Sequence, residues 1–147
     1  MIKDRKKLAG VLVVLNLAFI WGNSLMTGTD SGNLSGGIMA WLNEFLGLDQ
    51  AGMEILHHLI RKAAHFTEFA CLGALLGWRC SMDAQKHPIA FPALLGMAAG
   101  LVDETIQLFT PDRGPSLTDV WIDASGALTG IMVLILGHHL IKRKNNH

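Results

Sequence analysis

The sequence places ionisable and amide side chains inside stretches that are otherwise strongly apolar. Residues three or four apart are neighbours on a helix, so three pairs are each expected to share one helical face: His65 with Glu68, Asp103 with Gln107, and Asp119 with Asp123. If these stretches lie in a membrane, a charge near the bilayer centre costs about 3 kcal/mol on insertion scales. Such residues therefore indicate either a functional site or an internal ion-pair network.

A surplus of buried carboxylates is tolerated by protonation, by a bound cation, or by a cationic group of a ligand. Protonated carboxylates beside an imidazole suit general acid–base catalysis, for which the candidates are His65, Glu68, Asp103 and Glu104. An oxygen-rich cluster suits Mg²⁺, Ca²⁺ or Mn²⁺, and a histidine, His65, would admit Zn²⁺; the candidate oxygen ligands are Asp103, Glu104 and Asp119. The cations Lys62 and Arg113 would suit a phosphate or carboxylate. No Ser-His-Asp order, P-loop or HExxH motif in the sequence selects among these chemistries.

Structural roles could account for some of the same residues. Ser116 and Asp119 fit an S-x-x-D capping box at the start of a helix. Arg61 and Lys62 could extend to the headgroup region as interfacial anchors. The carboxylates could also pair with Arg61, Lys62 and Arg113, but these three cations would leave carboxylates in excess.

The composition restricts the class of protein that carries these residues. The chain has 147 residues, of which 50% are hydrophobic and 16% charged, with 12 basic and 12 acidic residues and a formal net charge of zero. Disordered chains and most nucleic-acid-binding proteins do not combine high hydrophobicity with charge neutrality. Two cysteines, Cys71 and Cys80, cannot form a disulfide framework. A small membrane protein fits these numbers.

Four apolar stretches predict an all-α, polytopic membrane protein with a single domain over residues 1–147. The predicted spans are residues 8–26, 63–80, 89–110 and 119–141. The first could instead be a signal peptide, but no small-x-small cleavage site follows its apolar core, so a retained span is expected. With four spans, both termini lie on the same side of the membrane, and nine of the 12 Lys and Arg residues lie on that side. Because Lys and Arg are retained on the cytoplasmic side, both termini are predicted to be cytoplasmic.

The longest outer segment is expected to hold an amphipathic helix. The run TGTDSGNLSGG at its start contains turn-forming residues, and an amphipathic segment over about 36–60 follows. Within it, apolar residues recur at i, i+3, i+4, i+7 and i+8, namely Ile38, Trp41, Leu42, Phe45 and Leu46. That spacing predicts a helix lying in the membrane interface. Beyond Gly47 the sequence is helical again from about Ala51 with no breaker before Ala63, so the second span could begin outside the bilayer.

Because the spans alternate in direction, the polar residues of the second, third and fourth spans are expected to lie at one depth in the membrane. The second and fourth spans carry them at their starts and the third at its end, which puts them near the outer surface. Small residues spaced as GxxxG let helix backbones approach closely, and each of these spans has such a pair: Gly73 and Gly77, Gly96 and Gly100, and Gly126 and Gly130. Packing on these faces predicts a polar pocket below the outer surface.

The polar residues belong to two longer runs, RKAAHFTEFACLG and LVDETIQLFTPDRGPSLTDVWIDASGALTG. With the four-span layout, they resemble the VanZ-like family of bacterial membrane proteins over most of the chain from Arg61 to Gly130. The resemblance lies in the motifs K-x-x-H-x-x-E, D-E-x-x-Q and P-x-R-x-x-S-x-x-D. It implies that the characteristic polar residues here are Lys62, His65, Glu68, Asp103, Glu104, Gln107, Arg113, Ser116 and Asp119. Asp123 stands where the family often has Asn, which adds an acidic group.

The resemblance implies a link with resistance to glycopeptide antibiotics, chiefly teicoplanin, which has a lipid tail. We expect a multi-pass protein of the bacterial cell membrane that binds or handles an anionic lipid, a lipid-linked cell-wall intermediate or a lipoglycopeptide, with no nucleic-acid partner. The expected ligand-binding residues are the nine characteristic ones and Asp123. The alternative is a membrane-embedded hydrolase or transferase, with or without a divalent cation, that acts on a lipid-linked phosphate or ester. Transport is less favoured, because the polar residues stop near one surface.

Overall fold

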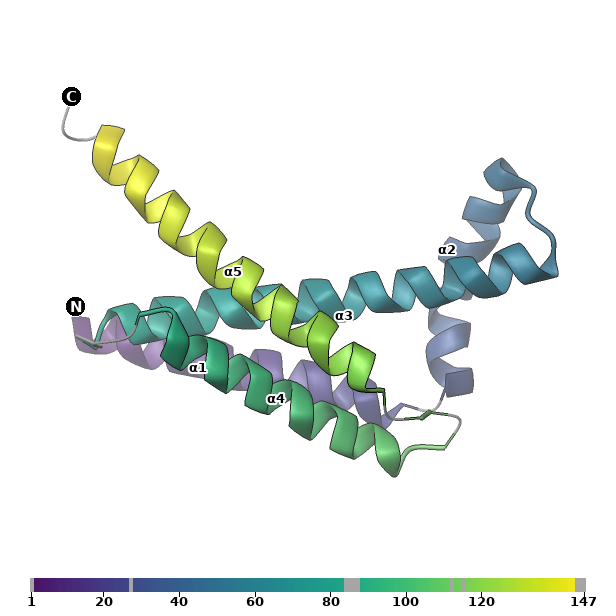
Figure 1. The fold of residues 1–147 in the computed structure, drawn as a ribbon, viewed down its shortest axis with the longest axis horizontal. Helices are drawn as coiled ribbons and strands as arrows, with labels where there is room; N and C mark the ends of the chain where they lie inside the picture. Colours follow the sequence, from purple (N-terminus) through teal and green to yellow (C-terminus); the bar gives the residue numbers. More distant parts are fainter. Residues whose placement is uncertain (1, 27, 84–87, 112, 115, 145–147) are drawn as a thin grey trace.

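The computed structural model describes residues 2–26, 28–83, 88–111, 113–114 and 116–144. Every regular element in these ranges is a helix, which confirms the all-α prediction (Figure 1). The five helices are α1 (Ile2–Leu25), α2 (Gly28–Leu46), α3 (Gln50–Ser81), α4 (Ala90–Leu108) and α5 (Leu117–Lys144).

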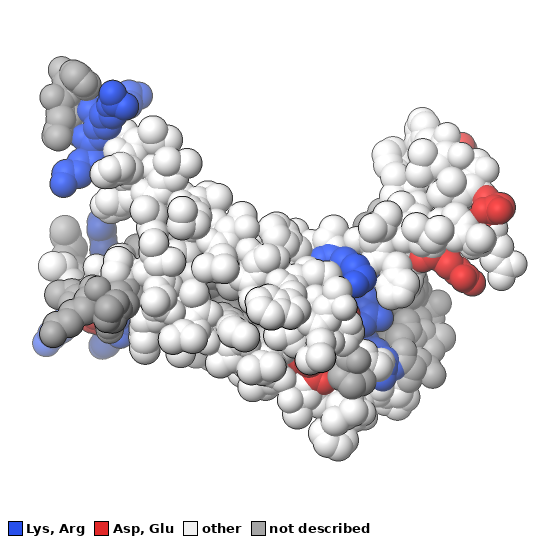
Figure 2. Space-filling model, viewed as in Figure 1, with Lys and Arg blue, Asp and Glu red and all other residues white. Residues whose placement is uncertain are grey.

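Helix α3 is the central element, since α1, α4 and α5 all pack against it. Helices α3 and α5 run in the same direction, and the beginning of α1 and the end of α5 lie on the same side of the molecule (Figure 1). We call this the basic end, because Lys and Arg side chains gather there (Figure 2). At the opposite end α1 and α4 finish and α5 begins, and the first part of α3 projects beyond the bundle toward α2 (Figure 1). We call this the polar end.

Small residues allow α3 and α5 to cross at backbone contact. A Cβ added to Gly126 would lie 2.5 Å from the Phe66 carbonyl oxygen, and one added to Gly73 would lie 2.0 Å from the Ala127 carbonyl oxygen. On α4, a Cβ at Gly96 would lie 2.7 Å from the Ala127 Cβ. Such distances leave no room for a side chain, so the predicted close packing at these glycines is confirmed.

A compact apolar cluster joins α1, α3 and α4. Ile20, Phe69, Leu72, Leu76 and Ala99 are buried together. Val13, Leu17 and Trp21 of α1 pack against this cluster, and the Trp21 indole donates to the Ala99 carbonyl at 3.4 Å. Helix α1 is therefore part of the folded bundle, as expected of a retained helix.

The outer surface of the bundle is apolar between its two ends. Figure 2 shows few charged side chains between the basic end and the polar end. Exposed large apolar residues occur along α1, α4 and α5, including Val14, Leu94 and Leu136, which are 64%, 63% and 60% exposed. The sequence predicts four membrane spans, whereas by length and composition two of the described helices, α1 and α5, could cross a membrane.

The segment between α1 and α3 differs from the sequence-based expectation. The run expected to form turns is already helical, because α2 begins at Gly28. Helix propensity is a weak preference that the surrounding structure can override, and the helix predicted around Trp41 extends back into this run. The expected division of the segment 36–60 at Gly47 is confirmed, since α2 ends before Gly47, whose φ of 58° suits glycine, and α3 begins at Gln50.

Helix α3 begins at Gln50, and the side chain of the preceding residue, Asp49, accepts a hydrogen bond from the Gly52 amide at 2.9 Å. It continues without a break to Ser81. The prediction that the helix of the second apolar stretch begins well before Ala63 is confirmed. On α2, Trp41 and Phe45 are exposed and their rings meet edge to face, 5.1 Å apart, while the side chain of Ile38 lies outside the described residues.

Candidate functional site

Polar side chains from four helices meet inside the polar end of the bundle. They come from the last turn of α1, the middle of α3, the end of α4 and the first turns of α5. At this end the helices direct apolar side chains outward and polar side chains into the bundle, the reverse of a helix bundle in water. The buried members are Ser24, His65, Asp103, Glu104, Gln107, Thr110 and Asp123.

The centre of this cluster is a trio of His65, Asp103 and Asp123, one from each of α3, α4 and α5. His65 is 8% exposed and both aspartates are 0% exposed. The His65 Nδ1 lies 3.8 Å from Asp103 Oδ2 and 3.8 Å from Asp123 Oδ1. These distances are too long for direct hydrogen bonds. One ligand-type atom from each residue lies within 4.8 Å of the others.

Asp103 is held in place by neighbouring polar side chains. The Ser24 hydroxyl donates to its Oδ1 at 2.6 Å, and the Gln107 amide donates to its Oδ2 at 2.8 Å. The same amide lies 3.4 Å from the Ser24 hydroxyl, and the Gln107 Oε1 accepts from Arg61 at 3.3 Å. The Asp103 carboxylate is therefore fixed from α1 and from its own helix.

Asp123 lacks such support. Both of its carboxylate oxygens are buried without a hydrogen-bond partner among the described residues, and so is His65 Nδ1. Its side chain occupies space that Gly100 leaves open, because a Cβ on Gly100 would lie 3.3 Å from Asp123 Oδ2. A buried carboxylate with no donor is costly unless it is protonated or meets a positive or donating partner.

Two further carboxylates line the cluster. The Glu104 Oε2 accepts from the Ser116 backbone amide at 2.6 Å, which ties the start of α5 to the end of α4. The Glu68 Oε1 accepts from the Asn23 side chain of α1 at 3.0 Å. The other Glu104 oxygen, Oε1, is buried and without a hydrogen-bond partner within the described ranges.

Cationic side chains lie beside the cluster. The Lys62 ammonium pairs with Asp119 at 3.0 Å. Arg61 donates to the neutral amide of Gln107, and Arg113 Nε is buried with no hydrogen-bond partner in the described part of the chain. Burial and then the charge of nearby Arg61 lower the pKa of the Arg113 guanidinium. Two arginines thus lie near each other without a salt bridge to a described carboxylate.

The predicted residues are brought together, but not in the predicted combinations. Of the three candidate metal ligands, Asp103 lies in the trio, whereas Glu104 bonds to Ser116 and Asp119 pairs with Lys62. Asp123, a predicted ligand-binding residue, lies beside Asp103 and His65. The sequence reading missed Asn23, Ser24 and Thr110, whose hydroxyl donates to the Ser24 carbonyl at 3.0 Å. Polar residues near the outer end of the first apolar stretch were the available signal.

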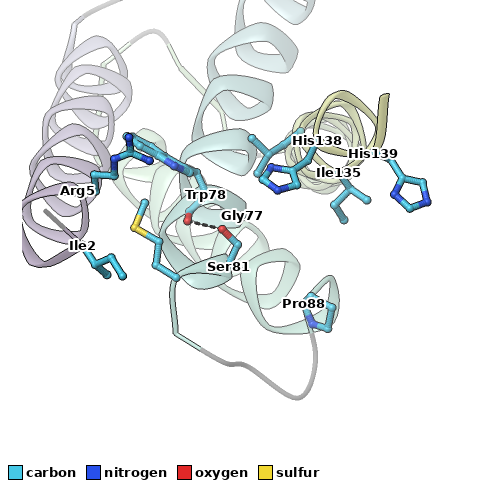
Figure 3. A pocket seen from close by; sticks show the side chains of 11 residues that line it. Ile2, Arg5, Gly77, Trp78, Ser81, Pro88, Ile135, His138 and His139 are labelled. Atoms are coloured by element: carbon cyan, nitrogen blue, oxygen red, sulfur yellow. Dashed lines mark hydrogen bonds between the residues drawn. The ribbon is translucent and has the colours of Figure 1, made fainter. Parts of the chain in front are cut away.

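A separate cavity lies at the basic end. Its volume is about 550 Å³, and Figure 3 shows the side chains around it, which include Arg5, Trp78, Ser81, His138 and His139. The Ser81 hydroxyl donates to the Trp78 carbonyl at 2.8 Å, the contact drawn in Figure 3. No carboxylate is among its described lining residues. Its described lining therefore lacks the buried carboxylates that the polar end combines with an imidazole.

Comparison with known proteins identifies a family. The model of the VanZ/LLP1 family matches residues 9–138, which include most of α1, all of α2 to α4 and most of α5. No curated protein and no solved structure matches the chain. The match spans every residue of the polar cluster, and the chain belongs to the VanZ/LLP1 family.

Proposed function

We propose that this protein is a multi-pass protein of the bacterial cell membrane, crossed by α1, α3, α4 and α5, whose polar end faces outward and binds the anionic group of an envelope lipid. The apolar surface of the bundle and the two span-length helices α1 and α5 support the membrane location. Helix α3 is surrounded by three other helices, so its span does not need an apolar residue on every face.

The observation that carries the ligand class is the pair of arginines beside the cluster. Arg113 has a buried, unpartnered Nε, and Arg61 contacts only a neutral amide in the described hydrogen bonds. Guanidinium groups bind phosphate and carboxylate through paired, charge-assisted hydrogen bonds. An anionic headgroup placed between them would supply the missing acceptors, and the acyl chains would lie along the apolar surface.

The substrate class follows from this chemistry: an anionic phospholipid, a polyprenyl-phosphate cell-wall intermediate, or a lipid-tailed glycopeptide such as teicoplanin. In this proposal the contacts are made by Lys62, Arg61 and Arg113, with Ser116 and Asp119 beside them. The link to glycopeptide resistance that the family resemblance implies would then arise from engagement of such lipids at the outer face.

The experiment compares lipid binding by the purified full chain and by two matched arginine variants. Binding to phosphatidylglycerol, undecaprenyl phosphate and neutral phosphatidylcholine would be measured by native mass spectrometry. Arg113→Gln should weaken binding of the two phosphate lipids about 10-fold or more, because a hydrogen bond to a charged group contributes about 1.5–3 kcal/mol. Arg143→Gln, at the exposed end of α5, is the control. Equal binding of all three lipids by the native protein would refute the proposal.

A second candidate is a hydrolase or transferase acting on a lipid-linked phosphate or ester. The buried trio favours it, because an imidazole beside two carboxylates could accept and donate a proton. In this reading His65 or Glu68 is the general base, and Asp103 and Glu104 complete the catalytic set. Release of inorganic phosphate or fatty acid from these lipids by native protein, but not by His65→Gln, would select the enzyme.

A further inference from the structure

Hydrogen bonds within the described part of the chain do not satisfy all the buried polar atoms of the trio of His65, Asp103 and Asp123. Asp103 uses its oxygens for Ser24 and Gln107, but the two Asp123 oxygens and His65 Nδ1 are buried and unpartnered. The three groups belong to different helices, and packing these helices together buries two carboxylates. Removing the carboxylates from water opposes folding. Something that binds between them would remove this cost.

The geometry of the trio fits a metal ion. Ligand atoms bound at 2.0–2.2 Å to a tetrahedral metal lie about 3.4 Å apart. The His65 Nδ1 distances of 3.8 Å to Asp103 and to Asp123 exceed this by a few tenths of an ångström, within reach of small side-chain rotations. Ser24 and Gln107 orient the Asp103 carboxylate in the way that outer hydrogen bonds orient metal ligands.

The charges of the trio also match a divalent ion. Two carboxylates and a neutral imidazole carry a charge of −2, which one divalent cation neutralises inside a region of low dielectric constant. Mixed nitrogen and oxygen ligands suit Zn²⁺ and its first-row neighbours better than Mg²⁺ or Ca²⁺, which prefer oxygen alone. Three protein ligands would leave a fourth tetrahedral position for water or a ligand oxygen.

We infer that His65, Asp103 and Asp123 form a binding site for one divalent transition-metal ion, with Zn²⁺ as the best-fitting ion. Of the oxygen ligands that the sequence suggested beside His65, the site keeps Asp103 and has Asp123 in place of Glu104 and Asp119, because Asp119 is paired with Lys62 and Glu104 with the Ser116 amide. It extends beyond the proposed lipid binding and does not depend on it, since the arginines that carry that proposal are not metal ligands.

The test titrates Co²⁺, which reports its coordination by visible absorption, into the metal-stripped full chain in detergent. The native protein should bind one Co²⁺ per chain, Zn²⁺ should displace it, and Zn²⁺ should raise the melting temperature. Asp123→Asn and His65→Gln should each lower the Co²⁺ affinity at least 10-fold. Glu54→Gln, which alters an exposed carboxylate on the same helix as His65, is the matched control.

Folding of the variants is checked without metal. Metal-free Asp123→Asn should melt at or above the temperature of metal-free native protein, because it loses a buried carboxylate that has no partner. Absence of Co²⁺ binding in the native chain, or equal affinity in folded Asp123→Asn, would overturn the site. Loss of Co²⁺ in Asp119→Asn with retention in Asp123→Asn would also overturn it.

Separate measurements test the metal proposal and the lipid proposal, so either one can be refuted without the other. Arg113→Gln should keep its Co²⁺ affinity while losing phosphate lipids, and the Co²⁺ titration is made in detergent without added lipid. A protein that binds Co²⁺ but shows no preference for phosphate lipids would retain the metal site and lose only the lipid proposal.

Discussion

Gly130 of α5 lies directly over the Ala70 carbonyl of α3, so closely that a Cβ on Gly130 would lie 1.8 Å from that oxygen. The obstacle is backbone rather than a flexible side chain, and neither helix can relax without changing the crossing. The contact sets how α5 is rotated against α3 and therefore which α5 residues face His65.

Gly130→Ala should lower the free energy of unfolding by about 1–3 kcal/mol, since overpacking of a tight contact forces the backbone to move. The readout is the melting temperature of the purified chain in detergent. Gly137→Ala is the matched control on the same helix, because nothing lies within 4 Å of a Cβ there. The control should be neutral or slightly stabilised, as alanine favours helix over glycine by about 1 kcal/mol. Equal melting temperatures for the two variants would contradict the crossing.

Ser24→Ala tests whether α1 contributes to the buried cluster. Removal of the hydroxyl leaves the Asp103 Oδ1 without its 2.6 Å donor, and an unsatisfied buried acceptor costs about 1–3 kcal/mol. Ser125→Ala is the control, because that exposed hydroxyl bonds only to the Ile122 carbonyl of its own helix. The measurement is again thermal unfolding. No change in Ser24→Ala, together with a mature protein that lacks the first helix by mass spectrometry, would show that α1 is a signal peptide.

The common depth of the polar residues could be predicted from the sequence, whereas their partners could not. A helix rises 1.5 Å per residue, so position along each span and span direction determine depth. Partners depend on helix rotation, which close contacts such as Gly130 to Ala70 determine. Because α3 and α5 run in the same direction, Lys62 meets Asp119 and, about one turn further along both helices, His65 meets Asp123.

Other differences have equally local causes. The α2 start was missed because glycine, serine and asparagine favour turns in isolation, yet the segment continues the amphipathic helix that Trp41 and Phe45 indicated. Ser24 and Asn23 were missed because one hydroxyl and one amide barely alter the apolar character of α1. Both contact carboxylates of other helices, which no spacing rule within a single helix can reveal.

The pH dependence at the basic end should depend on Asp83. This residue, just beyond α3, pairs with Lys6 of α1 and Arg79 of α3, and those hydrogen bonds lower the pKa of Asp83 from its ordinary value of 3.8. A lowered pKa adds stability at neutral pH, and this contribution is lost as the pH falls through the folded-state value. Asp83→Asn should therefore melt slightly below native protein at pH 7, and the difference should begin to shrink near pH 3.8 and vanish only below the lowered folded-state pKa.

The measurement for Asp83 is a series of melting curves from pH 7 to pH 3 at low and high salt. Exposed ion pairs are screened by salt, so the pH 7 difference should shrink at high ionic strength. Glu44→Gln alters an exposed carboxylate on α2 and should show no such pH-dependent difference. A difference between native and Asp83→Asn protein that is as large at pH 3 as at pH 7 would assign the effect to the side-chain substitution rather than to the charge.

The proposed topology predicts opposite labelling of the two ends of the molecule. In a background with Cys71 and Cys80 replaced by serine, Gly37→Cys on α2 should react with a membrane-impermeant maleimide in intact cells, because the polar end faces outward. Lys142→Cys in the last turn of α5 should react only after permeabilisation, because Lys and Arg are retained on the cytoplasmic side. Both positions are exposed, so accessibility within the fold does not limit either reaction. Labelling of Lys142→Cys but not of Gly37→Cys in intact cells would reverse the orientation, and the anionic lipid would then have to come from the inner leaflet.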